Sequence, residues 1–235
     1  AHGQHGLAVV VFTGIVAAYL WPYWQKGESE AVQTQSCPSL TDWMHNLGAH
    51  VSPKVEVSSF MVPNNQRDLL GLPRQINAPL ISIRGLKARV EIAENEVVVS
   101  APLDLLLNTR SVRTTPMVQY INALQQRNDA RPLNQLQIVA LFLLVEQDNP
   151  HSKWHGYICN LPSWKELDTP ALWSEDRVAE LKAVDPSKVG GLLKRRQEIM
   201  DWWQDIFPFL FKHFPSSFSV KTHSQGRWAW AVSVC

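Results

Sequence analysis

Residues 6–24 carry no charged side chain, and this run limits the possible folds of the chain more than any other feature. As an α-helix, these roughly nineteen residues would span about 28 Å, close to the hydrocarbon thickness of a bilayer. Trp21, Tyr23 and Trp24 lie at the C-terminal end of the run, and aromatic side chains favour the headgroup region. The sequence therefore predicts an N-terminal transmembrane helix and a single-pass membrane protein, with organelle membranes among the candidates. The alternative is a buried core helix or a processed leader segment.

The rest of the chain divides by composition and periodicity. We expect a membrane anchor at residues 1–26, a polar linker at residues 27–38, a strand-rich part at residues 39–132 and a helical part at residues 133–235. The fold class is then α+β with a transmembrane helix.

Three predicted helices are clear enough to be given bounds. A short helix begins near Thr41 or Asp42 and ends at about Leu47, and longer helices cover residues 133–145 and 187–213. Short β-branched runs between the first helix and residue 100 predict strands. Pro208 is expected to kink or end the last helix. The aromatic and aliphatic residues of that helix recur at helical spacing, which favours packing in a core. Its basic start leaves a membrane surface or a partner protein as the alternative.

Composition excludes some partners and sites. At 45% hydrophobic residues the chain can bury a substantial core, and a net charge of +1 provides no field to hold a phosphate backbone, so nucleic acid is not an expected partner. Cys37, Cys159 and Cys235 are far apart and follow no metal-ligand spacing. This spacing argues against a disulfide framework and against a zinc site, and no metal is expected.

Four blocks of sequence, taken in order, resemble the SET domain of the group that includes the Rubisco large-subunit methyltransferase and the actin histidine methyltransferase. The blocks are residues 84–102, with a glycine turn, a strand, an acidic turn and a strand ending in Pro; residues 141–162, with a helix, a Trp-Tyr element and a Leu-Pro turn; residues 169–175, with Thr-Pro-x-x-Trp; and residues 228–232. The resemblance covers residues 40–235 and implies that residues 39–132 are the N-terminal part of a SET-like domain. Residues 133–235 then form its helical insert and the return to the SET core.

The resemblance implies methyl transfer from S-adenosylmethionine to a protein lysine or histidine nitrogen. The cofactor-binding residues would be Arg84, Gly85 and Leu86, because a glycine lets the backbone approach a ligand closely and a guanidinium can pair with the cofactor carboxylate. Ile83 stands where the group has its first glycine. The alternative to a cofactor site is that residues 84–87 form an ordinary turn at the entry of a strand.

No catalytic residue is assigned in this sequence. In the group, an Asn-His motif and a later tyrosine complete the site after the helical insert, and neither occurs in these 235 residues. His151 and His155 have no carboxylate-rich cluster beside them and are expected to serve surface or packing roles. The SET domain is therefore expected to be incomplete at its C-terminus. We expect residues 1–235 by themselves neither to bind S-adenosylmethionine appreciably nor to transfer its methyl group.

Two functions remain in view. The first is a membrane-anchored, non-catalytic structural or interaction subunit of a larger membrane complex, which contacts the bilayer through residues 6–24 and other protein subunits through exposed surfaces. Trp228, Trp230 and residues 97–99 are the predicted contacts. The second is a truncated record of an S-adenosylmethionine-dependent protein-lysine or protein-histidine N-methyltransferase.

Overall fold

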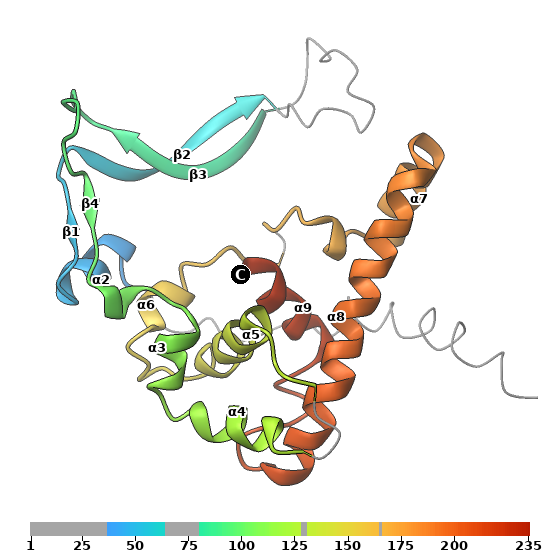
Figure 1. Cartoon of the computed structure of the whole chain (residues 1–235). Helices are drawn as coiled ribbons and strands as arrows, with labels where there is room; N and C mark the ends of the chain where they lie inside the picture. Colours follow the sequence, from blue (N-terminus) through green and yellow to red (C-terminus); the bar gives the residue numbers. More distant parts are fainter. Residues whose placement is uncertain (1–36, 64–79, 128–130, 165) are drawn as a thin grey trace, which may run out of the picture.

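The computed structural model describes residues 37–63, 80–127, 131–164 and 166–235. These residues form a β part followed by a helical part (Figure 1). The β part consists of the following elements: α2 (Leu40–Asn46), β1 (His50–Val51), β2 (Val55–Pro63), β3 (Leu80–Ala88), β4 (Val99–Ser100) and the 3₁₀ turn η1 (Leu103–Leu105). The predicted first helix is confirmed, but its N-cap is Ser39, whose hydroxyl accepts from the backbone N–H of Asp42.

The strands pair as two separate two-stranded antiparallel sheets. β1 pairs with β4, and β2 pairs with β3 over nine residues from Val55↔Ala88 to Pro63↔Leu80. The β2–β3 hairpin stands to one side of the helices (Figure 1). In the connection from β3 to β4, the Lys54 ammonium donates to the Glu96 carboxylate at 2.8 Å and holds the pKa of Glu96 below its usual range. This ion pair ties the acidic turn to the start of β2.

The helical part is built around α5 (Gln135–Glu146), which lies at its middle (Figure 1). Its other elements are α3 (Thr109–Arg113), α4 (Val118–Gln125), α6 (His155–Ile158), the 3₁₀ turn η2 (Pro170–Leu172), α7 (Glu175–Val184), α8 (Pro186–His213) and α9 (Gln225–Val234). Residues 140–144 of α5 are all buried. A helix that is apolar on every side needs neighbours on every side, and α3, α6 and α9 pack directly against it. α3 and α4 share this core with α5, and the domain boundaries stay a prediction.

Helix α8 continues through Pro208 to His213, so the prediction that the helix ends at Pro208 is wrong. A kink at Pro208 stays a prediction. Proline removes one backbone hydrogen bond from a helix interior. The loss is tolerated here because Phe207 and Leu210 on either side are completely buried, and their packing holds the last turns in place. The prediction of core packing for this helix, made from its aromatic residues, is confirmed by the same burial.

Helix α9 is fixed by polar contacts as well as by packing. The Arg227 guanidinium donates to both carboxylate oxygens of Asp148 at 2.8 Å, and the Trp228 indole donates to the Ile199 carbonyl at 3.0 Å. Trp228 and Trp230 are both buried inside the helical part. Their aromatic surface is therefore covered by this chain, and a contact with another protein at or near them stays a prediction.

The predicted transmembrane helix and the single-pass membrane localisation are corrected. No helix in the described part of the chain combines the length and the apolar character needed to cross a bilayer. Helix α8 has 28 residues but carries charged side chains along its length, including Lys194, Glu198 and Asp201, and α5 is apolar but has only 12 residues. The predicted span at residues 6–24 and its bilayer contact lie outside the described residues. The described residues form an α+β fold, and none of their helices meets the requirements of a membrane span.

A buried histidine makes the stability of this fold depend on pH. His223 is 3% exposed, and the rings of Phe207 and Phe218 lie beside it. Desolvation, together with the nearby Arg227 cation, lowers the pKa of His223 from 6.5 to about 4, although the Asp148 charge acts in the opposite direction. Below pH 6.5 the unfolded chain therefore binds a proton that the folded chain does not.

We expect the free energy of unfolding to fall by about 2 kcal/mol between pH 7 and pH 5. Urea titrations at the two pH values measure this, and a His223→Gln variant should lose that part of the pH dependence. An equal slope in both proteins would contradict the prediction.

Candidate functional site

The three predicted cofactor residues lie in the middle of β3, and the strand register separates them. Arg84 is opposite Ser59 and Leu86 is opposite Val57, so Arg84 and Leu86 share one face of the hairpin, whereas Gly85 points to the other face. Arg84 and Leu86 are exposed. The structure thus brings a cation and two exposed apolar side chains, Val57 and Leu86, to one face of β2–β3.

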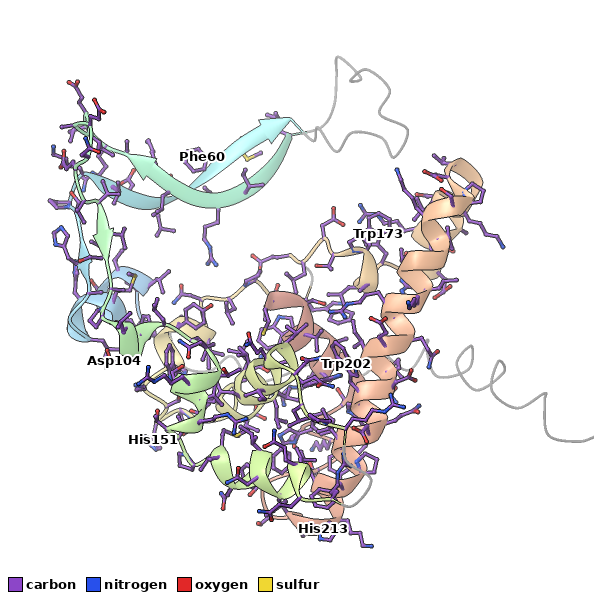
Figure 2. The ribbon with its side chains drawn as sticks, viewed as in Figure 1. Phe60, Asp104, His151, Trp173, Trp202 and His213 are labelled. Carbon is purple, nitrogen blue, oxygen red and sulfur yellow. A yellow bond between two sulfur atoms is a disulfide. The ribbon has the colours of Figure 1, made fainter. Side chains whose placement is uncertain are left out.

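Gly85 is part of a continuous strand and not of a turn. A Cβ atom added to Gly85 would lie 3.3 Å from a ring carbon of Phe60, a residue of β2 (Figure 2). The glycine is therefore explained by the close approach of the Phe60 ring across the hairpin. This differs from the sequence interpretation, in which Gly85 leaves room for a ligand. The assignment of Arg84, Gly85 and Leu86 to a cofactor stays a prediction.

The Arg84 guanidinium reaches across to the helical part and donates to the Asn160 carbonyl. Glu166, a few residues further along the same loop, has a pKa below its usual range, mainly because Ser163 donates hydrogen bonds to its carboxylate, with a smaller contribution from the Arg84 charge. The Arg84 guanidinium and the Glu166 carboxylate therefore attract each other across the space between β3 and the loop that follows α6. A guanidinium in this position can bind a carboxylate, and the exposed Leu86 beside it can contact an apolar group.

The loop after α6 is held from three sides. The Asn160 side-chain amide donates to the Pro38 carbonyl at 2.9 Å and to the Gly156 carbonyl at 2.8 Å. From α9, the Trp230 indole donates to the Pro162 carbonyl at 2.9 Å. Asn160 could not be predicted from the sequence, because an asparagine that follows a short helix carries no signal that it will contact residues 38 and 84.

The cysteines also differ from the sequence prediction. Cys37 and Cys159 are joined in a disulfide with a Cα–Cα distance of 5.9 Å, although 122 residues separate them. Their large separation in sequence was the reason for predicting no disulfide, and it does not report distance in the fold. Cys235 is a free cysteine.

Two cavities lie away from the hairpin. A cavity of about 350 Å³ is bounded by α2, η1 and α6, and one of about 370 Å³ by η2, α8 and α9. Trp43 and Tyr157 line the first, and Arg195 lines the second. His151, at the edge of the helical part in Figure 2, and His155 line neither cavity. Within the described ranges, no three His, Cys, Asp or Glu side chains gather in a way that could hold a metal ion.

Comparison with known proteins gives the class to which this fold and sequence correspond. No protein-family model matches the chain. It is 34% identical over 132 residues to the [fructose-bisphosphate aldolase]-lysine N-methyltransferase of Arabidopsis thaliana, covering 52% of this chain and 25% of the relative. It is 33% identical over 102 residues to the actin-histidine N-methyltransferase of Danio rerio, covering 42% and 16%.

Comparison with solved structures gives the fold of the same class of protein. A structure of the Rubisco large-subunit methyltransferase bound to sinefungin and monomethyllysine matches with a TM-score of 0.55 and 22% identity, over 86% of this chain and 39% of that one. The SET domain of the same enzyme, bound to lysine and AdoHcy, matches with a TM-score of 0.53 and 21% identity, over 81% and 37%. At this identity the likeness is one of fold.

The chain therefore resembles the SET-domain protein methyltransferases in sequence and has their type of fold. This confirms the family resemblance predicted from the four sequence blocks. The chain spans a quarter or less of the length of these two curated relatives.

Proposed function

We propose that this chain forms the N-terminal SET part and the helical insert of an S-adenosylmethionine-dependent protein N-methyltransferase that acts on a lysine or histidine side chain. The observation that carries the proposal is the likeness of fold, over 86% of the chain, to an enzyme bound to sinefungin and monomethyllysine. The relatives named for lysine and for histidine methylation leave both residue types as candidate acceptors.

In this proposal, three of the described residues would bind part of the cofactor. S-Adenosylmethionine supplies a methyl group on a positively charged sulfur, and its amino-acid end carries a carboxylate. Arg84 would bind that carboxylate, because an exposed guanidinium with a neighbouring loop can form a paired hydrogen bond with it. Leu86 and Val57, on the same face, would contact an apolar part of the ligand. The substrate protein is a further partner in this proposal.

The methyltransferase interpretation has more support than that of a membrane-anchored, non-catalytic subunit. Both relatives described above are named as methyltransferases. The other interpretation gains no support from the described residues, where no helix is long and apolar enough to cross a bilayer.

The direct test is methyl transfer by the protein that carries this chain. The purified protein is incubated with S-adenosylmethionine labelled in its methyl group and, in separate reactions, with fructose-bisphosphate aldolase, the Rubisco large subunit and actin. Peptide mass spectrometry of the products assigns the label to lysine or histidine. Transfer to either residue type supports the proposal. Absence of transfer to these three and to proteins of a cell extract, in a preparation that is folded, would overturn it.

Replacement of Arg84 tests the cofactor site separately. We expect Arg84→Ala to weaken S-adenosylmethionine binding about 10- to 100-fold, since a hydrogen bond to a charged group contributes about 1.5–3 kcal/mol. Lys87→Ala is the matched control, because Lys87 lies on the opposite face of β3 and pairs with Glu56 at 3.7 Å. Calorimetric titration compares the dissociation constants of the two variants with that of the unmodified protein. Equal affinity in all three proteins would exclude Arg84 from the site.

A further inference from the structure

The disulfide between Cys37 and Cys159 joins the β part to the helical part, in addition to the backbone connection and the non-covalent contacts between them. Cys37 precedes α2, the first helix of the β part, and Cys159 follows α6 of the helical part. Beside the bond, α2 rests on α6 through Trp43, whose indole donates to the Lys153 carbonyl at 2.7 Å. The covalent link therefore crosses the boundary between the β part and the helical core.

The residue after Cys159 is the one that contacts the candidate cofactor strand. Asn160 binds the Pro38 carbonyl with its side chain at 2.9 Å, and its own carbonyl accepts from the Arg84 guanidinium. Residues 37–38 and β3 thus meet at the same two residues, Cys159 and Asn160. A change in the position of this short segment would move the group to which Arg84 is bound.

The bond is accessible to a reducing partner. Cys37 is exposed, and Cys159 is only partly buried. Thiol–disulfide exchange needs one sulfur that an attacking thiolate can reach, which the Cys37 side provides.

We propose that the Cys37–Cys159 disulfide is a redox-sensitive latch that holds Asn160 in place and thereby positions Arg84. The reductant is a dithiol: one of its thiolates attacks a sulfur of the bond and forms a mixed disulfide, and its second thiol then closes a cyclic disulfide. Two electrons pass from the dithiol to the protein, whose two sulfurs leave as thiols after taking up the protons. The effect on cofactor binding rests on the proposed function, whereas the latch itself does not.

Thiol counting tests whether the latch exists. The protein, purified without reductant under oxidising conditions, is denatured and alkylated with iodoacetamide before and after treatment with dithiothreitol, and the adducts are located by mass spectrometry. We expect one adduct, on Cys235, before reduction and three afterwards, since the sequence has three cysteines. A Cys37→Ser variant should carry two adducts in both conditions. Three adducts on the untreated protein would overturn the proposal.

Melting and affinity test what the latch does. A bond that closes a loop of 122 residues should make the melting temperature of the oxidised protein about 10 °C higher than that of the reduced protein. Reduction should also weaken S-adenosylmethionine binding about fivefold or more, and neither quantity should respond to dithiothreitol in Cys37→Ser. A redox-dependent melting temperature without cofactor binding in either state would contradict the proposed function and leave the latch supported. Equal affinity in both states would overturn the positioning of Arg84.

Discussion

Replacement of Gly156 by alanine should lower the free energy of unfolding by roughly 2–4 kcal/mol. Gly156 is buried in α6, and a Cβ atom added to it would lie 2.5 Å from the Cγ and Cδ1 atoms of Trp43 and 2.8 Å from its Cβ atom. Such distances are far below van der Waals contact, so the indole has to move. Overpacking costs about 1–3 kcal/mol, and displacement of the indole also removes its hydrogen bond to the Lys153 carbonyl, worth about 1 kcal/mol.

Gly190→Ala is the matched control for this prediction. Gly190 lies inside α8 and a Cβ atom added to it meets nothing within 4 Å. Alanine favours a helix over glycine by about 0.5–1 kcal/mol, so this variant should be more stable than the unmodified protein. Urea unfolding followed by circular dichroism gives both values. Opposite signs are expected, and a Gly156→Ala protein as stable as the unmodified one would show that α2 does not rest on α6 in this way.

The buried guanidinium of Arg196 is expected to give an effect of similar size. It donates to the Ala171 carbonyl at 3.2 Å, to the Trp173 carbonyl and to the Glu175 carboxylate at 3.0 Å, and it is 5% exposed. Burial lowers the pKa of Arg196 from its usual value, in opposition to the Glu175 charge. Arg196→Met keeps an unbranched, largely apolar stem but leaves two carbonyl oxygens without their charged donor. We expect a loss of about 3–5 kcal/mol in the free energy of unfolding.

Arg195→Met separates this role from a general effect of charge. The Arg195 side chain is 39% exposed and pairs with Glu198 at 3.3 Å. Exposed pairs contribute about 0–1 kcal/mol, so this neighbouring substitution should change stability little. Chemical denaturation of the two variants measures the difference. If both substitutions cost the same, Arg196 does not hold η2 against α8.

The neighbouring arginines illustrate what a sequence leaves open. Both stand in the run Lys194-Arg195-Arg196, which the sequence interpretation treated as one basic start of a helix. Helical periodicity places successive residues about 100° apart around the axis, so one arginine turns to η2 while the other stays at the surface. Which of the two is buried depends on where η2 packs, and this contact is not encoded in the local pattern.

In the candidate site, too, the local sequence predicts some features and the tertiary contacts decide others. The β-branched residues before Arg84 predicted a strand, and the family resemblance predicted a glycine turn at Arg84, Gly85 and Leu86, which instead lie inside β3. The register of β2–β3 decides that Gly85 faces Phe60. The position of the loop after α6 decides that Arg84 reaches Asn160. The sequence analysis expected a glycine turn here because it could not supply the partner strand.

Local properties of the sequence by themselves determined the α+β class, the helices at α5 and α8, and the resemblance to SET-domain methyltransferases. Each depends on residues that are close together in the chain, where periodicity and turn chemistry act directly. The tertiary structure alone decided the Cys37–Cys159 bond and the burial of Trp228 and Trp230. These features join segments far apart in the sequence, and such contacts form only when the apolar faces of the helices have closed around α5.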